Sequence, residues 1–271
     1  MPRVKVFGSA QSPKAVPPWR TRKPRTVMIH AAAIAAEPGH PLHPADQRRS
    51  AARTGALLLA GQFIAMWTAF FILAPAINWP ASLGEPPAVI LPLIRAHASA
   101  VFLGYLSYII HALLLIPAAA ILPVALGMGP QQRTSLLFGG LAGFAKALGI
   151  SRWLFVMPGL ATAFTAPGAS IATRSAISVV YQAFNAYAGG IGEILGVGLF
   201  AGIWTLLLSA ALLKMGARML GIFGMAAGLL LLATLLSVVG IESPVLLTGS
   251  GIVWQLWTLA LAVKLWRSRL S

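Results

Sequence analysis

Apolar residues follow one another in six long stretches of this chain, with few ionised side chains inside them. An α-helix rises about 1.5 Å per residue and the hydrocarbon core of a bilayer is about 30 Å thick, so about twenty apolar residues span it. Transmembrane strands alternate apolar and polar residues instead, and these stretches do not. The pattern predicts an all-α bundle with six transmembrane helices, at residues 56–77, 99–126, 135–164, 187–213, 219–239 and 245–263.

Two segments depart from a simple span. The third stretch, 135–164, is too long for a helix perpendicular to the membrane, so we expect it to tilt or to break near Gly149. Residues 166–186 are semi-polar, and we expect a short interfacial helix there before the fourth span.

Basic residues give the expected orientation, because cytoplasmic loops carry more Lys and Arg than outer loops. With six spans and both termini in the cytoplasm, the outer loops hold Arg95 and Arg174. The inner segments then hold Arg48, Arg49, Arg53, Arg133, Lys214, Arg218, Lys264, Arg267 and Arg269. Five or seven spans would place one of these basic clusters outside.

Residues 1–50 are basic, rich in Pro and Ala, and lack apolar periodicity, which predicts a disordered arm before a transmembrane domain at 51–271. Three explanations stay open. The arm can contact anionic lipid headgroups, it can reflect an over-long gene start with the true start at Met28 or later, or it can be a targeting peptide containing Arg48 and Arg49.

Composition agrees with a membrane protein, since only 9% of the 271 residues are charged and 58% are hydrophobic. The net charge of +15 does not indicate nucleic-acid binding, because ten of the twenty Lys and Arg residues lie in the first 53 positions and the others sit mainly at helix ends. The expected partners are the lipid bilayer and, at the basic arm, anionic headgroups. The chain has no cysteine, which excludes thiol catalysis and Fe–S ligation.

Three ionised residues inside predicted spans are candidates for function: Lys146, Arg152 and Glu193. Glycines three and four residues from Glu193, and three residues from Lys146, indicate that both face a closely packed neighbouring helix. Arg152 and Glu193 fall at compatible depths in the outer half of the membrane, which predicts an ion pair that either clips helices together or gates a cavity. Lys146 lies deeper, near the level of His111.

The second span carries a polar stripe, because His97, Gly104, Tyr108 and His111 are spaced by seven, four and three residues on one helical face. Such a stripe makes interhelical hydrogen bonds or lines a polar cavity. His97 and His111 are about 21 Å apart along one helix and cannot ligate the same ion. Neither a His-Glu-x-x-His nor a Gly-x-Ser-x-Gly motif occurs, so the sequence predicts no catalytic residue, cofactor site or metal site.

Several short elements give a family resemblance. They are Ala52-Arg53-Thr54-Gly55 before the first span, Arg152-Trp153-Leu154, the segment from Tyr181 to Tyr187 before a glycine-rich span, and a final Trp-containing span with a basic exit. With these the chain resembles the domain of unknown function 4386, a family of uncharacterised six-helix, mainly bacterial membrane proteins. The resemblance covers about Arg53 to Arg267 and implies a fold and a bacterial inner-membrane location, but no catalytic residue.

Three classes of function follow. The first is an integral membrane protein of unassigned role that acts without catalysis, through partners or lipid. The second is a small-solute or proton-coupled transporter that uses Lys146, Arg152, Glu193 and the His97–His111 stripe. The third is a membrane-embedded enzyme that acts on an apolar substrate.

Overall fold

The computed structural model describes residues 43–241 and 243–267. In these residues the chain forms only helices and turns, and six helical runs are long and apolar enough to cross a membrane. This confirms the predicted all-α bundle of six spans. Residues 1–42 of the predicted arm lie outside the described part of the chain.

Three of the six spans are single helices, and the other three combine two or three helical segments. The spans are, in order, α1 (Pro44–Ile77); α3 (Ala98–Ala125); α4 (Gln132–Phe155) followed by α5 (Met157–Phe164); α6 (Ile171–Gly189), the π-helix η3 (Gly190–Ala201) and α7 (Gly202–Lys214); α8 (Arg218–Ala233) with the 3₁₀-helix η4 (Thr234–Val239); and α9 (Pro244–Arg267). The short helices are η1 (Ala81–Gly84), α2 (Pro87–Ala96) and η2 (Gly129–Gln131).

The first helix begins earlier than its apolar stretch. The side chain of His43 accepts a hydrogen bond from the Ala45 N–H, and Pro44 occupies the first turn, where its missing N–H has no helical partner to lose. Residues 44–50, including Arg48 and Arg49, are therefore helical, although the sequence assigned them to a disordered arm. Capping by His43 extends the helix beyond the apolar residues.

The third span breaks, but the predicted position near Gly149 is wrong. Helix α4 continues through Gly149 to Phe155, and α5 begins at Met157. Pro158 explains the position of the break, because a proline has no N–H for the helix and disfavours helical geometry in the residue before it.

The predicted separate interfacial helix before the fourth span is also wrong. Ser170 caps the start of α6, since its Oγ accepts a hydrogen bond from the Thr173 N–H at 3.1 Å. From Ile171 the helix continues without a break through η3 to Lys214. The semi-polar residues are thus the first half of one long helix.

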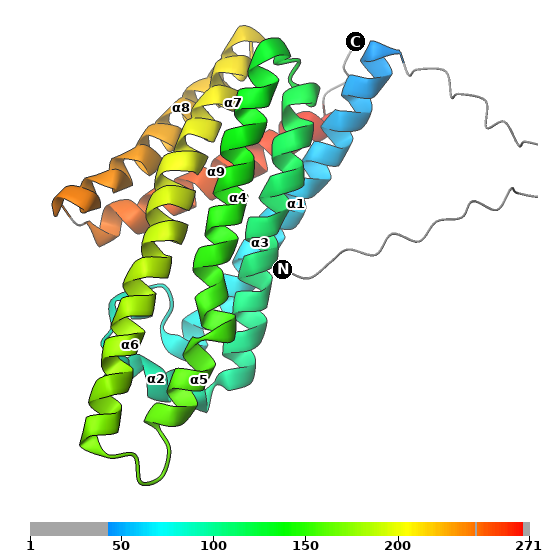
Figure 1. Ribbon diagram of the computed structural model, residues 1–271. Helices are drawn as coiled ribbons and strands as arrows, with labels where there is room; N and C mark the ends of the chain where they lie inside the picture. Colours follow the sequence, from blue (N-terminus) through cyan, green and yellow to red (C-terminus); the bar gives the residue numbers. More distant parts are fainter. Residues whose placement is uncertain (1–42, 242, 268–271) are drawn as a thin grey trace, which may run out of the picture. The chain divides into compact units, whose positions relative to one another are not determined.

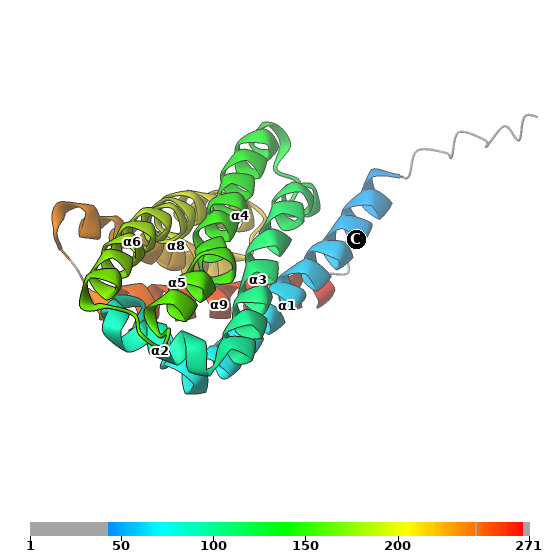
Figure 2. The ribbon, with the colours of Figure 1, turned by 60° about the horizontal axis from the view of Figure 1, so that its bottom comes forward.

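The six spans close into a ring, shown in Figures 1 and 2. Around the ring, α1 packs on α3, α3 on α4, α4 on η3, α7 on α8, α8 on α9, and α9 back on α1. Helix α1 begins and α9 ends at the same end of the bundle, as an even number of spans requires (Figure 1). We call this the basic end; its basic residues are Arg48, Arg49, Arg53, Arg133, Lys214, Arg218, Lys264 and Arg267.

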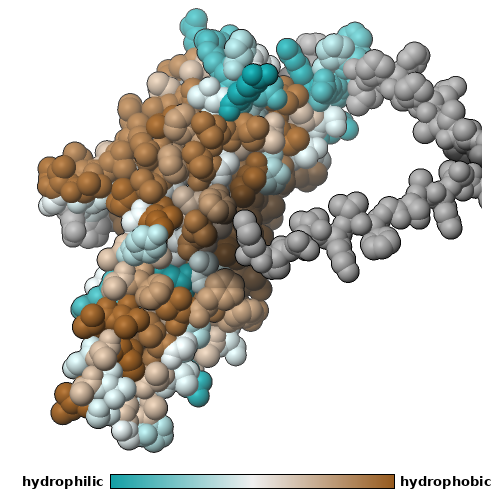
Figure 3. All heavy atoms as spheres, viewed as in Figure 1, coloured by the Kyte–Doolittle hydropathy of each residue, from teal (hydrophilic) through white to brown (hydrophobic). Residues whose placement is uncertain are grey.

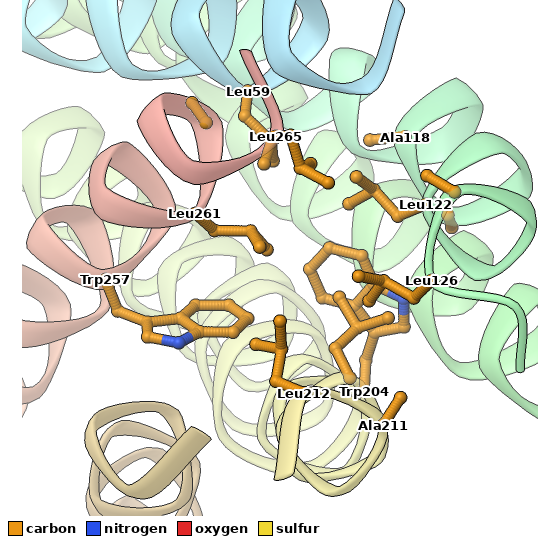
Figure 4. Close-up of a cluster of buried hydrophobic side chains, with 14 of the residues drawn as sticks. Leu59, Ala118, Leu122, Leu126, Trp204, Ala211, Leu212, Trp257, Leu261 and Leu265 are labelled. Carbon is orange, nitrogen blue, oxygen red and sulfur yellow. The ribbon is translucent and has the colours of Figure 1, made fainter. Parts of the chain in front are cut away.

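Two clusters of buried side chains fill the ring. The cluster toward the basic end contains Trp204, Trp257 and Leu261, which Figure 4 shows pointing toward one another. The second cluster includes Tyr105, Trp153 and Ile90. Leucine and phenylalanine side chains remain exposed around the outside, such as Leu57 and Phe144. Figure 3 shows a largely hydrophobic, brown surface below the hydrophilic basic end. That surface faces lipid in a membrane.

Helix α4 and the π-helix η3 approach each other through glycine. A Cβ placed on Gly149 would lie 2.5 Å from the Cα of Gly192, and one on Gly196 would lie 2.9 Å from the backbone N of Lys146. Only hydrogen fits at these positions, as in other small-residue helix contacts in membranes. This contact fixes the height at which Lys146, Arg152 and Glu193 lie relative to one another.

The bundle extends well beyond the α8–α9 turn at the end opposite the basic end (Figure 1). The run Ile171–Lys214 has 44 residues, about 65 Å of helix at the usual rise, or about twice the thickness of a hydrocarbon core. At that end α2 packs on α5 and on α6, and α5 packs on α6. We call these three segments, residues 87–96, 157–164 and 171–189, the far-end cap.

Candidate functional site

Gln62 of α1 and His111 of α3 hold each other by two reciprocal hydrogen bonds. The Gln62 Nε2 donates to the backbone oxygen of His111 at 3.2 Å, and the His111 Nδ1 lies 3.0 Å from the backbone oxygen of Gln62. Each side chain is only 1% exposed. Because a carbonyl only accepts, His111 carries its proton on Nδ1 and presents the lone pair of Nε2 to the opposite side.

Lys146 of α4 occupies that opposite side. Its Nζ lies 2.9 Å from the His111 Nε2 and 4.7 Å from the centre of the Trp254 ring of α9. The tautomer of His111 makes Lys146 the donor. Within the described residues Lys146 has no carboxylate at ion-pair distance, and its side chain is 4% exposed. A lysine near the middle of a span costs at least about 2.5–3.5 kcal/mol, which the imidazole and the aromatic ring offset in part.

Tyr108 connects His111 to Trp79, which lies in the turn after α1. Its ring stacks on His111 with centroids 5.8 Å apart and meets Trp79 edge-on at 5.5 Å. The polar stripe predicted on the second span is therefore only partly one unit. His97 lies in the exposed turn between α2 and α3, and Gly104 receives the side chain of Leu73 rather than a polar group.

The ion pair predicted between Arg152 and Glu193 is present, with Nη2 and Oε1 3.3 Å apart. Arg152 also donates from Nε to the Asn185 Oδ1 at 3.2 Å and from Nη1 to the backbone oxygen of Gly149 at 2.9 Å. The Asn185 Nδ2 continues to the backbone oxygen of Leu83 at 3.3 Å. Arg152 is 5% exposed and Glu193 is 37% exposed, so the carboxylate is the accessible member of the pair.

Glu193 stands on the π-helix η3. A π-helix is rare, and where it occurs it is often at a functional site, because the wider turn changes the direction in which side chains project. Here it coincides with the glycines that let η3 approach α4. Glycine supplies no side chain to fill the space between turns, which permits the unusual winding.

Buried hydroxyl groups surround Arg152 without completing their hydrogen bonds. The hydroxyls of Tyr105 and Tyr181, 1% and 2% exposed, have no hydrogen-bond partner in the described part of the chain. The ring of Tyr105 stacks on Trp153 with centroids 4.9 Å apart, and the Arg152 guanidinium carbon lies 5.2 Å from the centre of the same Trp153 ring. Such groups in a buried site call for a ligand or water.

The predicted candidates thus fall into two sites. Lys146, His111 and Tyr108 form a Lys146–His111 cluster, Arg152 and Glu193 form an Arg152–Glu193 site, and His97 belongs to neither. Sequence reasoning missed the uncharged partners Gln62, Trp254, Asn185, Tyr105 and Tyr181. A lone glutamine within an apolar span was the available signal for Gln62, because an amide in lipid needs a partner. Among the residues that the structure describes, no group of three His, Asp or Glu side chains is arranged to hold a metal.

The fold and these sites define an integral membrane protein with six helices and buried polar contacts between them. The family model described as domain of unknown function (DUF4386) matches residues 53–270, and the chain belongs to this family. No curated protein and no solved structure matches the chain.

Proposed function

We propose that this protein is a proton-coupled transporter of a small solute, in which Lys146 and His111 carry the proton. The observation that supports this most directly is the buried contact between the Lys146 Nζ and the His111 Nε2, 2.9 Å long and without a nearby carboxylate in the described residues. A buried ammonium is costly to desolvate, whereas an apolar side chain could pack at this position without that cost. Ionisable residues inside spans commonly serve proton or solute pathways.

The geometry links the proton to helix contacts. The Lys146 ammonium holds α3 through His111 and α9 through Trp254, and His111 in turn holds α1 through Gln62. Loss of the proton from Lys146 removes the charge that binds the Trp254 ring and weakens the hydrogen bond to His111. Contacts among four of the six spans therefore depend on one proton, which is what a carrier needs to couple protonation to a change of helix packing.

Accessibility to a small polar thiol reagent tests this function, because the native chain has no cysteine to react. In a transporter, water reaches the stripe, so Tyr108→Cys and His111→Cys should be labelled. Leu113→Cys, on the lipid side of the same helix, should stay unlabelled, and Ala96→Cys, at the exposed last residue of α2, should react fully. Absence of label at both stripe positions, with Ala96→Cys reactive, contradicts transport.

Proton coupling has its own measurement in the same variants. The labelling rate at Tyr108→Cys, divided by the rate at Ala96→Cys, corrects for the pH dependence of the thiol itself. We expect this ratio to change with pH and to become independent of pH when Lys146→Met is added. A ratio that still changes with pH in the Lys146→Met background assigns the proton to another group.

Action through lipid or partners, without catalysis or transport, is the second candidate. It is favoured by the eight basic residues gathered at the basic end, where each Lys or Arg near an anionic membrane surface contributes about 1 kcal/mol. For either function we place the basic end in the cytoplasm of a bacterium, with the protein in the inner membrane. If this candidate is correct, Lys146→Met leaves the function intact, while neutralising several basic residues abolishes it.

A further inference from the structure

The Arg152–Glu193 ion pair is weak for an arginine–carboxylate pair. The two side chains meet through one nitrogen and one oxygen at 3.3 Å, instead of the two parallel contacts that make arginine–carboxylate pairs strong. Arg152 directs one N–H to Asn185, one to Gly149 and one to Glu193, and guanidinium has five. Within the part of the chain that the structure describes, two N–H groups of this buried cation are thus left for another acceptor.

Further donors lie around the same guanidinium. The Tyr105 and Tyr181 hydroxyls are buried and have no hydrogen-bond partner in the described residues. The Tyr105 ring stacks on Trp153, whose ring centre lies 5.2 Å from the Arg152 guanidinium carbon, and Tyr181 lies one helical turn before Asn185, the α6 residue that Arg152 bonds. One cation and two free hydroxyl donors define a place for an oxyanion. The only negative group that the structure shows at this cation is the partly exposed Glu193.

The same site has an open side. A Cβ on Gly189 would lie 3.6 Å from the Arg152 Nη2 and 3.9 Å from the Glu193 Oε1. Glycine at the end of α6 therefore leaves the space directly beside the ion pair without a side chain. A small molecule approaching there meets Glu193 first and Arg152 behind it.

We propose that Arg152, Tyr105 and Tyr181 form a binding site for a small organic carboxylate, which displaces Glu193 from Arg152 when it binds. The carboxylate takes the two unused N–H groups of Arg152 and the hydroxyls of the two tyrosines. Glu193 acts as the competing internal anion. This inference rests on the proposed function by naming its solute class, but binding at this site is measured without transport.

The test is binding of lactate to the purified full-length protein in nanodiscs, by titration calorimetry, with lactamide as the uncharged control. Lactate should bind saturably and lactamide should not. Arg152→Lys should weaken binding by at least about tenfold, since it removes the guanidinium fork, and Tyr105→Phe or Tyr181→Phe by about fivefold each. Tyr187→Phe, a matched change at an exposed tyrosine, should leave affinity unchanged.

Glu193→Gln is the decisive variant, because we expect it to tighten lactate binding whereas the substitutions at Arg152, Tyr105 and Tyr181 weaken it. Removal of the competing charge should tighten lactate binding several-fold. If the ion pair were only structural, Glu193→Gln would leave lactate binding unchanged or weaken it. Unchanged or weaker binding in Glu193→Gln, binding of lactamide equal to lactate, or binding of inorganic phosphate alone overturns the carboxylate site. Lactate binding with no labelling at either Tyr108→Cys or His111→Cys, while Ala96→Cys reacts, would keep this site and reject the transporter.

Discussion

Hydrogen bonds between side chains and the backbone of a neighbouring helix connect the spans at the level of single residues. Gln62 and His111 are the clearest case, because each bonds the other's backbone oxygen across α1 and α3. In membranes such bonds contribute about 0.6 kcal/mol on average and at most about 1.7 kcal/mol, because helices in lipid find other partners when they separate.

Gln62→Leu should therefore lower the free energy of unfolding by about 0.6–1.7 kcal/mol. The substitution removes the donor to His111 and keeps an apolar side chain of similar size in a buried position. Unfolding in detergent is the measurement, and Gln182→Leu, at an exposed site on α6, is the matched control with no expected loss. Equal stability of the two variants would contradict the Gln62–His111 contact.

The Arg152–Glu193 pair predicts a charge-reversal rescue. Arg152→Glu and Glu193→Arg should each lower the amount of folded protein in the membrane, because each places two like charges in contact. The double variant restores opposite charges and should recover much of the loss. The measurement is the amount of monodisperse protein extracted in mild detergent. A double variant as poor as the worse single one would speak against the contact.

Between elements, Gly149 and Gly192 bring the backbones of α4 and η3 into direct contact. Gly149→Ala would place a Cβ 2.5 Å from a backbone carbon that cannot rotate away. We expect it to destabilise the protein by about 1–3 kcal/mol, the range for overpacking. Gly190→Ala, where a Cβ meets nothing within 4 Å, should be neutral or slightly stabilising. Thermal unfolding of the two variants in detergent compares them, and equal melting temperatures would refute the glycine contact.

How far the sequence predicts these elements depends on what determines each one. The spans follow from continuous apolar residues, because lipid selects them without regard to their neighbours. Helix α1 begins at Pro44 and α6 at Ile171 because His43 and Ser170 cap them. A hydropathy pattern does not report such caps, so these two starts were not predicted. The π-helix η3 was not predicted either, because hydropathy does not distinguish π-helical from α-helical winding.

The candidate sites also contain some contacts that the sequence predicts and others that it does not. Glycine spacing around Glu193 and depth along the spans were enough to predict the pair with Arg152, because both charges need a partner in the membrane. Trp254 beside Lys146, and the two tyrosines beside Arg152, depend on how each helix is rotated within the ring. Helix rotation is set by packing of the whole bundle, so short-range sequence patterns do not contain it.

At the scale of the whole molecule, the spans have unequal lengths. The fourth run, Ile171–Lys214, has twice as many residues as Arg218–Val239, which packs beside its second half. A bilayer of ordinary thickness covers the shorter run and leaves the far-end cap outside the hydrocarbon. The cap would then stand in water or among headgroups, at the end of the bundle opposite most of the basic residues.

Cysteine labelling in intact cells tests this arrangement. With the basic end in the cytoplasm, Ala172→Cys on the exposed side of the cap should react with a membrane-impermeant thiol reagent. Gln131→Cys, exposed in the α3–α4 turn, should react only after the membrane is permeabilised, and Leu229→Cys on the lipid-facing side of α8 should react in neither case. Reaction of Gln131→Cys in intact cells would reverse the orientation. Protection of Ala172→Cys both before and after permeabilisation would instead place the cap inside the bilayer.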